Sequence, residues 1–268
     1  MAKAVRVKND QQAQIVKKLN SLEGRFRRWQ IWQDFILMMA TRIANVFPGP
    51  CWQEREDTYL KIVKQYGKKE LDIIAEMAAL VVDGLDKNPS QDFLGELFMS
   101  LELGRNWKGQ FFTPYSVCQM MAQVTGLEYV KNICAEKGWA GVNDPACGAG
   151  ATLIAFANEC RAAGINYQQK ILFTAQDIDR LAGMMCYIQL SLLGCPGYVV
   201  IADTLSKPAR SYDKKGLLPA AGQDVWYTPM YYSDIWSGRK IAAKMDLMME
   251  RVLAWKEAVP NNMGLLFF

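Results

Sequence analysis

A glycine-rich turn that begins with Asp-Pro holds the residues of this sequence best suited to binding a ligand. Residues 143–150 read Asn-Asp-Pro-Ala-Cys-Gly-Ala-Gly and lie between an expected strand and an expected helix. Glycines let the backbone turn tightly and approach a ligand, and the first N–H groups of the next helix are oriented toward it. Because no Gly-Lys-Ser/Thr follows, the turn is not a phosphate-binding loop of the Walker type. Packing alone is the alternative explanation for such glycines.

Carboxylates follow the next two expected strands. Asp177 and Asp179 end the second strand, 27 and 29 residues beyond Gly150, and Asp203 ends the third. Ligands of open α/β sheets lie at the carboxyl ends of the strands, and an acidic residue there can accept hydrogen bonds from ribose hydroxyls. Asp203 is suited to accept from an adenine amino group. Each carboxylate alone is also typical of a helix N-cap, but three successive strand ends favour a cofactor site.

The composition excludes several kinds of chemistry. The chain of 268 residues has no histidine, which rules out Ser-His-Asp and Cys-His nucleophiles and histidine metal sites. Its seven cysteines contain no Cys-x-x-Cys pair, so neither a zinc cluster nor a disulfide framework is expected, and a cytoplasmic setting fits. The apolar stretch 31–47 is short and is interrupted by Asp34 and Arg42, so we expect no membrane span.

Positive charge is concentrated at the N-terminus. Residues 1–28 hold eight Lys or Arg against two acidic residues, a net charge of +6, whereas the whole chain carries +4. Contact with a polyanion such as DNA and a solvated helix face are both consistent with this segment. A second candidate for nucleic-acid contact is an aromatic patch that could stack on bases or fill the core, formed by Trp226, Tyr227, Tyr231, Tyr232 and Trp236.

These residues need elements to position them, and hydrophobic periodicity predicts two kinds. Apolar residues at helical spacing predict helices throughout the first hundred residues, at 11–22, 29–46, 55–66, 69–85 and 91–103. Ser90 is the expected N-cap of the last of these. From about residue 139 β-type runs alternate with helices, which predicts βαβ units and a parallel sheet. The expected strands lie near 141–143, 170–175, 198–201, 224–227 and 265–268, with helices at 151–163, 180–193 and 237–258.

The order of these motifs resembles that of the N-6 DNA methylase family, whose best-known members are modification subunits of type I restriction–modification systems. Gly-Gln-Phe-Phe-Thr-Pro at 109–114 and Asp-Pro-Ala-Cys-Gly-Ala-Gly at 144–150 carry the resemblance. Asp-Phe-Leu-Gly at 92–95, Ala-Gln-Asp-Ile-Asp at 175–179 and Ala-Asp-Thr-Leu at 202–205 are similar too. The resemblance covers roughly residues 90–205.

The resemblance implies S-adenosylmethionine as the cofactor and a role for each motif residue. Phe112, Thr113 and Pro114 would wrap the methionine end of the cofactor. Asp177 would bind its ribose and Asp203 its adenine. The amino-acid portion would be held by a carboxylate and the backbone of the glycine-rich turn, namely Asp144, Cys147, Gly148 and Gly150.

The sequence departs from the family where catalysis is expected. The family carries Asn/Asp-Pro-Pro-Tyr/Phe at the end of its fourth strand, which accepts from the amino group of a flipped adenine and stacks on the base. The nearest equivalent here is Thr228-Pro229-Met230-Tyr231. Thr228, Pro229 and Tyr231 are therefore the candidate catalytic residues, with a hydroxyl in place of an amide oxygen.

We therefore expect a helical domain at 1–90 and a Rossmann-like methyltransferase domain at 91–268, possessing an α/β fold that binds S-adenosylmethionine. One hypothesis is an enzyme that methylates adenine N6 in DNA without a metal, as in restriction–modification. A second is a degenerate homologue that acts as a partner subunit or nucleic-acid-binding module. A third is a methyltransferase acting on RNA or a small molecule. Expected partners are DNA and either a specificity subunit or a second copy, and no membrane.

Overall fold

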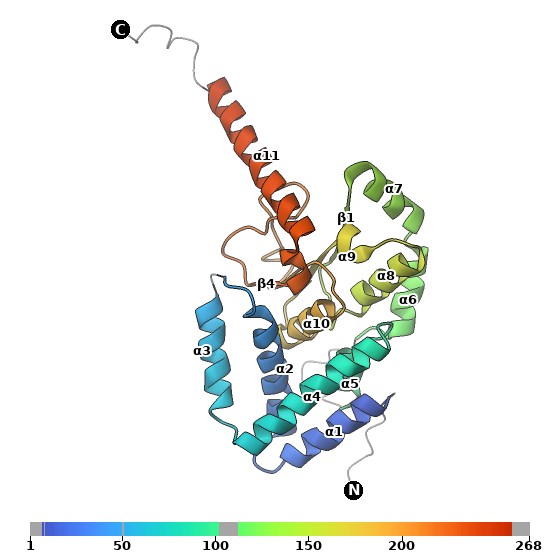
Figure 1. Cartoon of the computed structure of the whole chain (residues 1–268), viewed down its shortest axis with the longest axis vertical. Coiled ribbons are helices and arrows are strands. Elements are labelled where there is room, and N and C mark those ends of the chain that lie inside the picture. Colours follow the sequence, from blue (N-terminus) through green and yellow to red (C-terminus); the bar gives the residue numbers. More distant parts are fainter. Residues whose placement is uncertain (1–6, 8, 50, 102–111, 259–268) are drawn as a thin grey trace, which may run out of the picture.

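The N-terminal part of the chain is a group of helices set against one end of an α/β part (Figure 1). The computed structural model describes residues 7, 9–49, 51–101 and 112–258. The helices of the first part are α1 (Asp10–Leu22), α2 (Arg28–Ala44), α3 (Trp52–Val63), α4 (Lys68–Lys87) and α5 (Phe93–Ser100). These confirm the helical pattern of the first hundred residues, with bounds that differ by a few residues.

Amphipathic patterning explains why these helices pack together. In α1 the apolar residues Ile15, Val16, Leu19 and Leu22 recur at helical spacing and are all buried. The N-cap of α5 is Asp92 rather than the expected Ser90: its carboxylate accepts a hydrogen bond from the backbone N–H of Gly95 at 2.9 Å.

The α/β part contains a mixed four-stranded sheet in the order β1-β2-β3-β4. Its strands are β1 (Ala140–Asp144), β2 (Ile171–Asp177), β3 (Gly197–Ile201) and β4 (Val225–Tyr227). The helices of this part are α6 (Tyr115–Val124), α7 (Leu127–Lys137), α8 (Ala151–Ala162), α9 (Tyr167–Lys170), α10 (Arg180–Leu192), the short 3₁₀-helix η2 (Pro229–Tyr232) and α11 (Asp234–Ala258). The first three strands are parallel, as the alternation of strands and helices predicts.

The fourth strand corrects the expectation of a parallel sheet. β4 pairs antiparallel with β3, so that Tyr227 lies opposite Tyr198 and Val225 opposite Val200. Two parallel strands begin at the same end of the sheet. The connection between them must therefore return the chain to that end, usually through a helix. Residues 202–224 contain no helix; they fold over one face of the sheet, where the Tyr198 hydroxyl donates to the carbonyl of Gly216, and return to Ile201 at the end of β3, so the next strand runs backward. The expected fifth strand at 265–268 lies outside the described residues.

The sheet buries a different cluster of side chains on each face. Toward the helices, Phe173, Ala175 and Val199 join the large core that also contains α1, α2, α5 and α10. The other face carries a smaller cluster that includes Tyr198 and Trp236 under the 202–224 connection and the start of α11. The large core continues from the helical part into the α/β part, so the boundary expected near residue 90 is crossed by buried contacts. The two-domain division stays a prediction.

Candidate cofactor site

The turn after β1 has a backbone that requires glycine at two positions. Gly148 and Gly150 have φ angles of +53° and +95°, in the left-handed region. A Cβ added to Gly150 would lie 2.9 Å from the sulfur of Cys186, and one added to Gly148 would lie 3.0 Å from the ring of Phe112. The glycines therefore serve both the turn and the close packing around it, and α8 begins directly after Gly150.

Asp177 joins the end of β2 to this turn. Its Oδ2 accepts a hydrogen bond from the backbone N–H of Gly148 at 2.8 Å, and its Oδ1 accepts from the N–H of Asp179 at 2.8 Å. Burial raises the pKa of Asp177, and the two backbone hydrogen bonds oppose that rise. A carboxylate has about four acceptor positions, so each oxygen keeps one for a further donor such as a ribose hydroxyl.

Asp144 supports the turn from its other side. Its Oδ1 accepts from the N–H of Ala146 at 3.1 Å, and its Oδ2 accepts from the hydroxyl of Thr152 in the first turn of α8. The carboxylate thereby fixes the start of the turn relative to the helix that follows. Asp144 is only half-buried, so its remaining acceptor positions are open to a ligand ammonium group.

Asp203 lies beyond the end of β3, close to the same turn. Its two oxygens accept from the N–H of Leu205 at 2.9 Å and from the hydroxyl of Ser206 at 3.0 Å. The pKa of Asp203 is lowered, first by the hydrogen bond from the Leu205 N–H and then by that from the Ser206 hydroxyl. The hydroxyl of Thr204 donates to the carbonyl oxygen of Pro145 in the glycine-rich turn. The segments that follow β1 and β3 are thus in direct contact.

Two buried glutamines, which sequence reasoning missed, hold these segments in register. In Gln176 the amide nitrogen donates to the carbonyls of Ala202 at 3.0 Å and Lys207 at 2.9 Å, and the amide oxygen accepts from the N–H of Ala209 at 2.8 Å. Every strong donor and acceptor of this side chain is thereby directed at the connection that carries Asp203.

The second glutamine, Gln189 of α10, links the glycine-rich turn to α5. Its amide nitrogen donates to Asp92 and to the carbonyl of Ala149, both at 2.8 Å, and its oxygen accepts from the N–H of Leu94 at 3.0 Å. Gln176 and Gln189 are 1% and 0% exposed within otherwise apolar runs. A lone amide in such a run is the signal that could have identified both, because buried amides are kept only where all their hydrogen bonds are made.

Three N–H groups of the turn, those of Cys147, Gly148 and Gly150, are already hydrogen-bonded within the protein. The N–H of Cys147 donates to the carbonyl of Gln176 at 2.9 Å, and that of Gly150 to the carbonyl of Cys147 at 2.8 Å. The N–H of Gly148 is bonded to Asp177. The pKa of the Cys147 thiol is raised, first by a hydrogen bond with Cys186 and then by burial, so the Cys147 sulfur is a neutral packing group beneath the turn. The turn is consequently held in shape by its own bonds.

Of the Phe-Thr-Pro run, Phe112 is the residue that packs against the glycine-rich turn. The ring of Phe112 packs on Gly148 and contacts the ring of Phe98, with 5.6 Å between centroids. Thr113 and Pro114 are exposed, and Pro114 precedes the first turn of α6. The earlier part of the run, 109–111, lies outside the described residues.

S-adenosylmethionine needs carboxylate acceptors for its ribose and amines, and a close backbone beside its methionine part. The ends of β1, β2 and β3 supply three carboxylates with free acceptor positions, and the two positive-φ glycines allow the turn backbone to pack closely beside them. The residues present therefore fit the cofactor. Asp144, Asp177 and Asp203 would hold its polar groups, and Phe112 would cover the turn beside them.

The three candidate catalytic residues lie at the other end of the sheet. Thr228 follows β4, and because β4 runs backward it lies beside Gly197, where β3 begins. Its hydroxyl donates to the carbonyl of Cys195 at 2.7 Å and accepts from the N–H of Gly197 at 3.0 Å. β3 and the residues up to Asp203 separate the two ends by about 20 Å of extended chain. The structure therefore does not bring Thr228 to the cofactor site.

Pro229 and Tyr231 occupy the same remote position. Tyr231 is 4% exposed and its hydroxyl donates to the carbonyl of Leu217 at 2.6 Å, so its ring is not open to a base. Trp226 and Trp236 are buried as well, whereas Tyr227 and Tyr232 are half-buried. Three of the five residues in the aromatic patch are therefore core residues, which was the alternative to base stacking.

Comparison with known proteins agrees with the motifs at the strand ends. The sequence profile of the N-6 DNA methylase family matches residues 96–259, which is more than half of the chain. The chain belongs to the N-6 DNA methylase family. This assigns S-adenosylmethionine as its cofactor and methyl transfer as its type of function, on a Rossmann-like α/β fold behind a helical N-terminal region.

Other comparisons add little to the family assignment. A Listeria monocytogenes protein, provisionally described as a class I S-adenosylmethionine-dependent methyltransferase, is 15% identical with a TM-score of 0.45. The match covers 86% of this chain and 78% of that one, and the similarity is too distant to bear on function. No curated protein sequence matches. Within the described residues, no helix is both long and apolar enough to span a membrane.

Proposed function

We propose that this protein is an S-adenosylmethionine-dependent methyltransferase that acts on adenine N6 in DNA. The observation that carries the proposal is the joining of three strand ends into one site. Gly148 is hydrogen-bonded to Asp177, and Thr204 beside Asp203 is hydrogen-bonded to Pro145. Family membership supplies the reaction type.

The residues of this site bind and orient; they do not form covalent intermediates. When bound, S-adenosylmethionine supplies an activated methyl group for direct in-line attack by the amino nitrogen. Asp177 would accept from the ribose hydroxyls, Asp203 from the cofactor's adenine, and Asp144 from the ammonium group of its methionine part. Such charge-assisted hydrogen bonds fix the position of the methyl group relative to the open edge of the sheet.

A second candidate function is favoured by the position of Thr228. In the described residues no Asn/Asp-Pro-Pro-aromatic motif stands beside the cofactor carboxylates, and Thr228 is buried at the other end of β3. Losing one polar contact to the reacting centre typically costs ~10²–10³ in rate. The second candidate is therefore a cofactor-binding homologue that works as a partner subunit, with the adenine contacts supplied by another chain such as a specificity or modification subunit.

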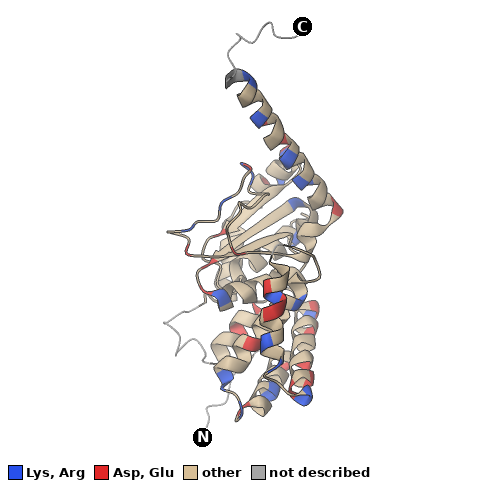
Figure 2. Cartoon of the chain, turned by 90° about the vertical axis from the view of Figure 1, so that its left-hand side faces the viewer, with Lys and Arg blue, Asp and Glu red and all other residues tan. Residues whose placement is uncertain are grey.

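DNA contact is proposed through the basic N-terminal segment rather than the buried aromatics. Within it Lys18 pairs with Glu76, Arg25 with Glu70 and Arg28 with Glu23. Figure 2 accordingly shows basic and acidic residues intermixed over the helical part. The basic residues left for phosphate contacts are those without such a pair or outside the described residues, namely Lys3, Arg6, Lys8, Lys17 and Arg27. A role in restriction–modification in the cytoplasm follows from the same proposal.

Calorimetric titration followed by a methyl-transfer assay tests the proposal and separates the two candidates. The protein is titrated with S-adenosylmethionine and its demethylated product, and then incubated with tritiated cofactor and adenine-rich duplex DNA. Binding with label on adenine N6 supports the enzyme. Binding without transfer supports the partner subunit. If neither compound binds, both candidates are excluded.

A further inference from the structure

Helix α11 exposes a row of apolar side chains that no other described part of the chain buries. From residue 241 onward, seven of its large apolar residues are between 46% and 66% exposed. Five of them recur at alternating spacings of four and three, which places them on one side of the helix. We call these five the α11 stripe: Ile241, Met245, Met248, Val252 and Trp255.

The start of α11 is anchored, so the stripe cannot turn back onto its own helical part. Trp236 is fully buried and its indole donates to the carbonyl of Gln168 at 2.8 Å. Arg239 donates to the carbonyls of Gln169 and Gly138 at 2.7 and 3.2 Å. From this base the helix projects away from the body (Figure 1), which leaves the stripe on the surface.

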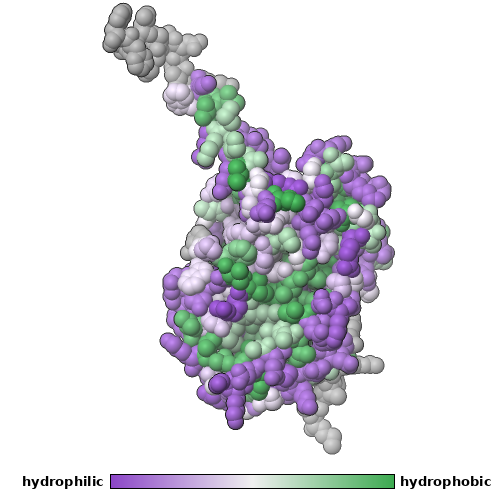
Figure 3. All heavy atoms as spheres, in the orientation of Figure 1, coloured by the Kyte–Doolittle hydropathy of each residue, from purple (hydrophilic) through white to green (hydrophobic). Residues whose placement is uncertain are grey.

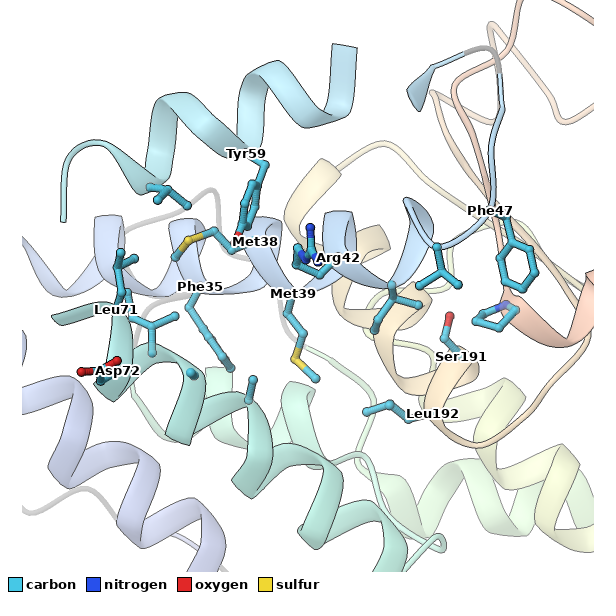
Figure 4. A pocket seen from close by; sticks show the side chains of 17 residues that line it. Phe35, Met38, Met39, Arg42, Phe47, Tyr59, Leu71, Asp72, Ser191 and Leu192 are labelled. Atoms are coloured by element: carbon cyan, nitrogen blue, oxygen red, sulfur yellow. The ribbon is translucent and has the colours of Figure 1, made fainter. Parts of the chain in front are cut away.

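The same chain contains a groove of suitable chemistry. A cavity of about 910 Å³ lies between α2, α3, α4 and the end of α10 (Figure 4). Among the residues lining it, only Arg42 and Asp72 are charged. We call this cavity the apolar groove; its walls include Met38, Met39, Tyr59, Val63, Leu71 and Ala75.

The apolar groove and the α11 stripe belong to one face of the molecule. Phe47 and Pro229 line the groove, and the ring of Phe47 stacks on Tyr232 with 4.3 Å between centroids. Tyr232 in turn lines a second cavity, of about 730 Å³, whose other wall includes Ile241 and Met248 of the stripe. Figure 3 shows apolar side chains on this face both in the hollow of the body and along α11.

We propose that α11 docks into the apolar groove of a second copy of this chain, in a two-fold dimer. A two-fold axis that places this face against the same face of the second copy sets each stripe over the groove of the other copy. The same contact then forms twice, and the assembly stops at two chains. An amphipathic helix in an apolar groove is a common mode of recognition, and methionines on both surfaces adapt to one another.

The distribution of charge favours docking of α11 in the groove of a second copy over direct contact between the α11 stripes of two copies. Lys244 and Arg251 flank one side of the stripe, and Asp246 and Glu250 lie on the opposite side of the helix. Two α11 helices in direct contact would bring these basic flanks together. In the groove, by contrast, Asp72 is exposed and makes no ion pair with any described residue, so it offers a partner for Lys244 or Arg251.

Light scattering during size-exclusion chromatography over a dilution series tests the proposal. The unaltered chain is expected at twice its mass of 30.3 kDa. Met248→Glu places a charge in the stripe and should reduce the mass to one chain, whereas Leu253→Glu, on the other side of the helix, should leave the dimer intact. Both sites are exposed, so neither change disturbs the core, and circular dichroism checks that α11 persists.

Groove variants complete the test. Ala75→Lys fills the apolar groove and should give single chains, whereas Ala79→Lys, one turn further along α4 and outside the cavity, should not. Mixing Met248→Glu with Ala75→Lys restores one intact helix and groove pair, so dimers should reappear only in the mixture. A monomeric unaltered chain overturns the proposal, including one that sediments with anionic vesicles instead. Dimers that survive Ala75→Lys but not Met248→Glu also overturn it, because the helices would then pair with each other.

Discussion

Asp177 accepts a hydrogen bond from the backbone N–H of Gly148, with 2.8 Å between Oδ2 and the nitrogen. This contact fixes the turn after β1 to the end of β2, and it uses only part of the carboxylate's acceptor capacity. The same side chain is thereby a brace for the turn and the proposed acceptor for the ribose. Substitutions at this position should report on both roles, and they can be separated by measuring affinity and stability together.

Replacing Asp177 with Ala should weaken S-adenosylmethionine binding by about 1–3 kcal/mol, because charge-assisted hydrogen bonds to the ribose are removed. Titration calorimetry measures the affinity, and thermal unfolding shows whether the turn has loosened. Asp177→Asn keeps one acceptor for Gly148 and removes the charge, so it should keep more stability than affinity. Unchanged affinity in both variants would remove Asp177 from the ribose site.

Cofactor affinity should also depend on pH through Asp177. Burial raises the pKa of this carboxyl in the free protein, so it takes up a proton at a higher pH than an exposed aspartate. Ribose hydroxyls donate to the charged form, so affinity should fall as the pH drops through the raised pKa. Calorimetry over a mildly acidic series measures the effect, and Asp177→Asn should flatten it. A decline of equal size in that variant would assign the pH dependence to another group.

Gly150→Ala should cost more stability than Gly164→Ala. Both glycines have positive φ, +95° and +78°, so each substitution carries backbone strain of about 1–2 kcal/mol. A Cβ at Gly164 meets nothing within 4 Å, whereas one at Gly150 would lie 2.9 Å from the sulfur of Cys186. Overpacking should add about 1–3 kcal/mol at Gly150. Chemical unfolding of both variants measures the difference, and equal losses of stability would contradict close packing under the turn.

The local sequence pattern was sufficient to predict those elements whose position depends mainly on the burial of one apolar face. Apolar spacing predicted α1 to α4, and the alternation of strands and helices predicted β1 to β3. The segment that contains α6 and α7 received no helix, because Gly126 and Gly138 interrupt it and exposed apolar residues such as Val124 blur its periodicity. Long amphipathic elements are read from sequence more easily than short ones that pack mainly on neighbours.

The orientation of β4 explains why the three carboxylates lie at one end of the sheet and the catalytic candidates at the other. Asp144, Asp177 and Asp203 follow parallel strands, so their positions depend only on strand order. Thr228 depends on the path of the chain between β3 and β4, and the alternation of strands and helices predicted a parallel sheet there. The lack of a helix-forming run in 206–224 was the signal for an antiparallel return. Gln176 and Gln189 act through tertiary contacts, which no local pattern encodes.

DNA binding should depend on salt mainly through the basic residues of the N-terminal segment other than Lys18, Arg25 and Arg28, which are held in ion pairs. Deleting residues 1–28 is not a clean test, because Ile15, Leu19 and Leu22 of α1 are in the core. The better variant changes five other basic residues to Gln: Lys17 and Arg27, which make no ion pair with a described residue, and Lys3, Arg6 and Lys8, which lie outside the described residues. The logarithmic salt slope of duplex binding should fall by about 0.9 for each DNA phosphate that the variant no longer neutralises.

The control for the salt experiment changes Lys18, Arg25 and Arg28, whose side chains pair with Glu76, Glu70 and Glu23. It removes fewer phosphate contacts and should alter the slope less. Fluorescence anisotropy with labelled duplex at several salt concentrations measures both variants. Identical slopes for the first variant and the unaltered protein would mean that the segment is only a solvated helix face.

Restoring a family-like motif at strand four should not create adenine methylation. The double variant Thr228→Asn with Met230→Pro resembles the family's Asn-Pro-Pro-Tyr, yet residue 228 lies beside Gly197 and not beside Asp203. The Thr228 hydroxyl bonds Cys195 and Gly197 in a buried site, so a larger amide there should cost about 1–3 kcal/mol of folding stability through overpacking and broken hydrogen bonds. Thr228→Ser keeps the hydroxyl and should cost only about 1 kcal/mol.

Tritiated-methyl incorporation into DNA and chemical unfolding together measure the outcome of the double variant, and cofactor titration checks that the distant cofactor site is intact. Methylation that appears only in the double variant would place residue 228 at the reacting base, and would require β4 to run parallel to β3 in the working enzyme.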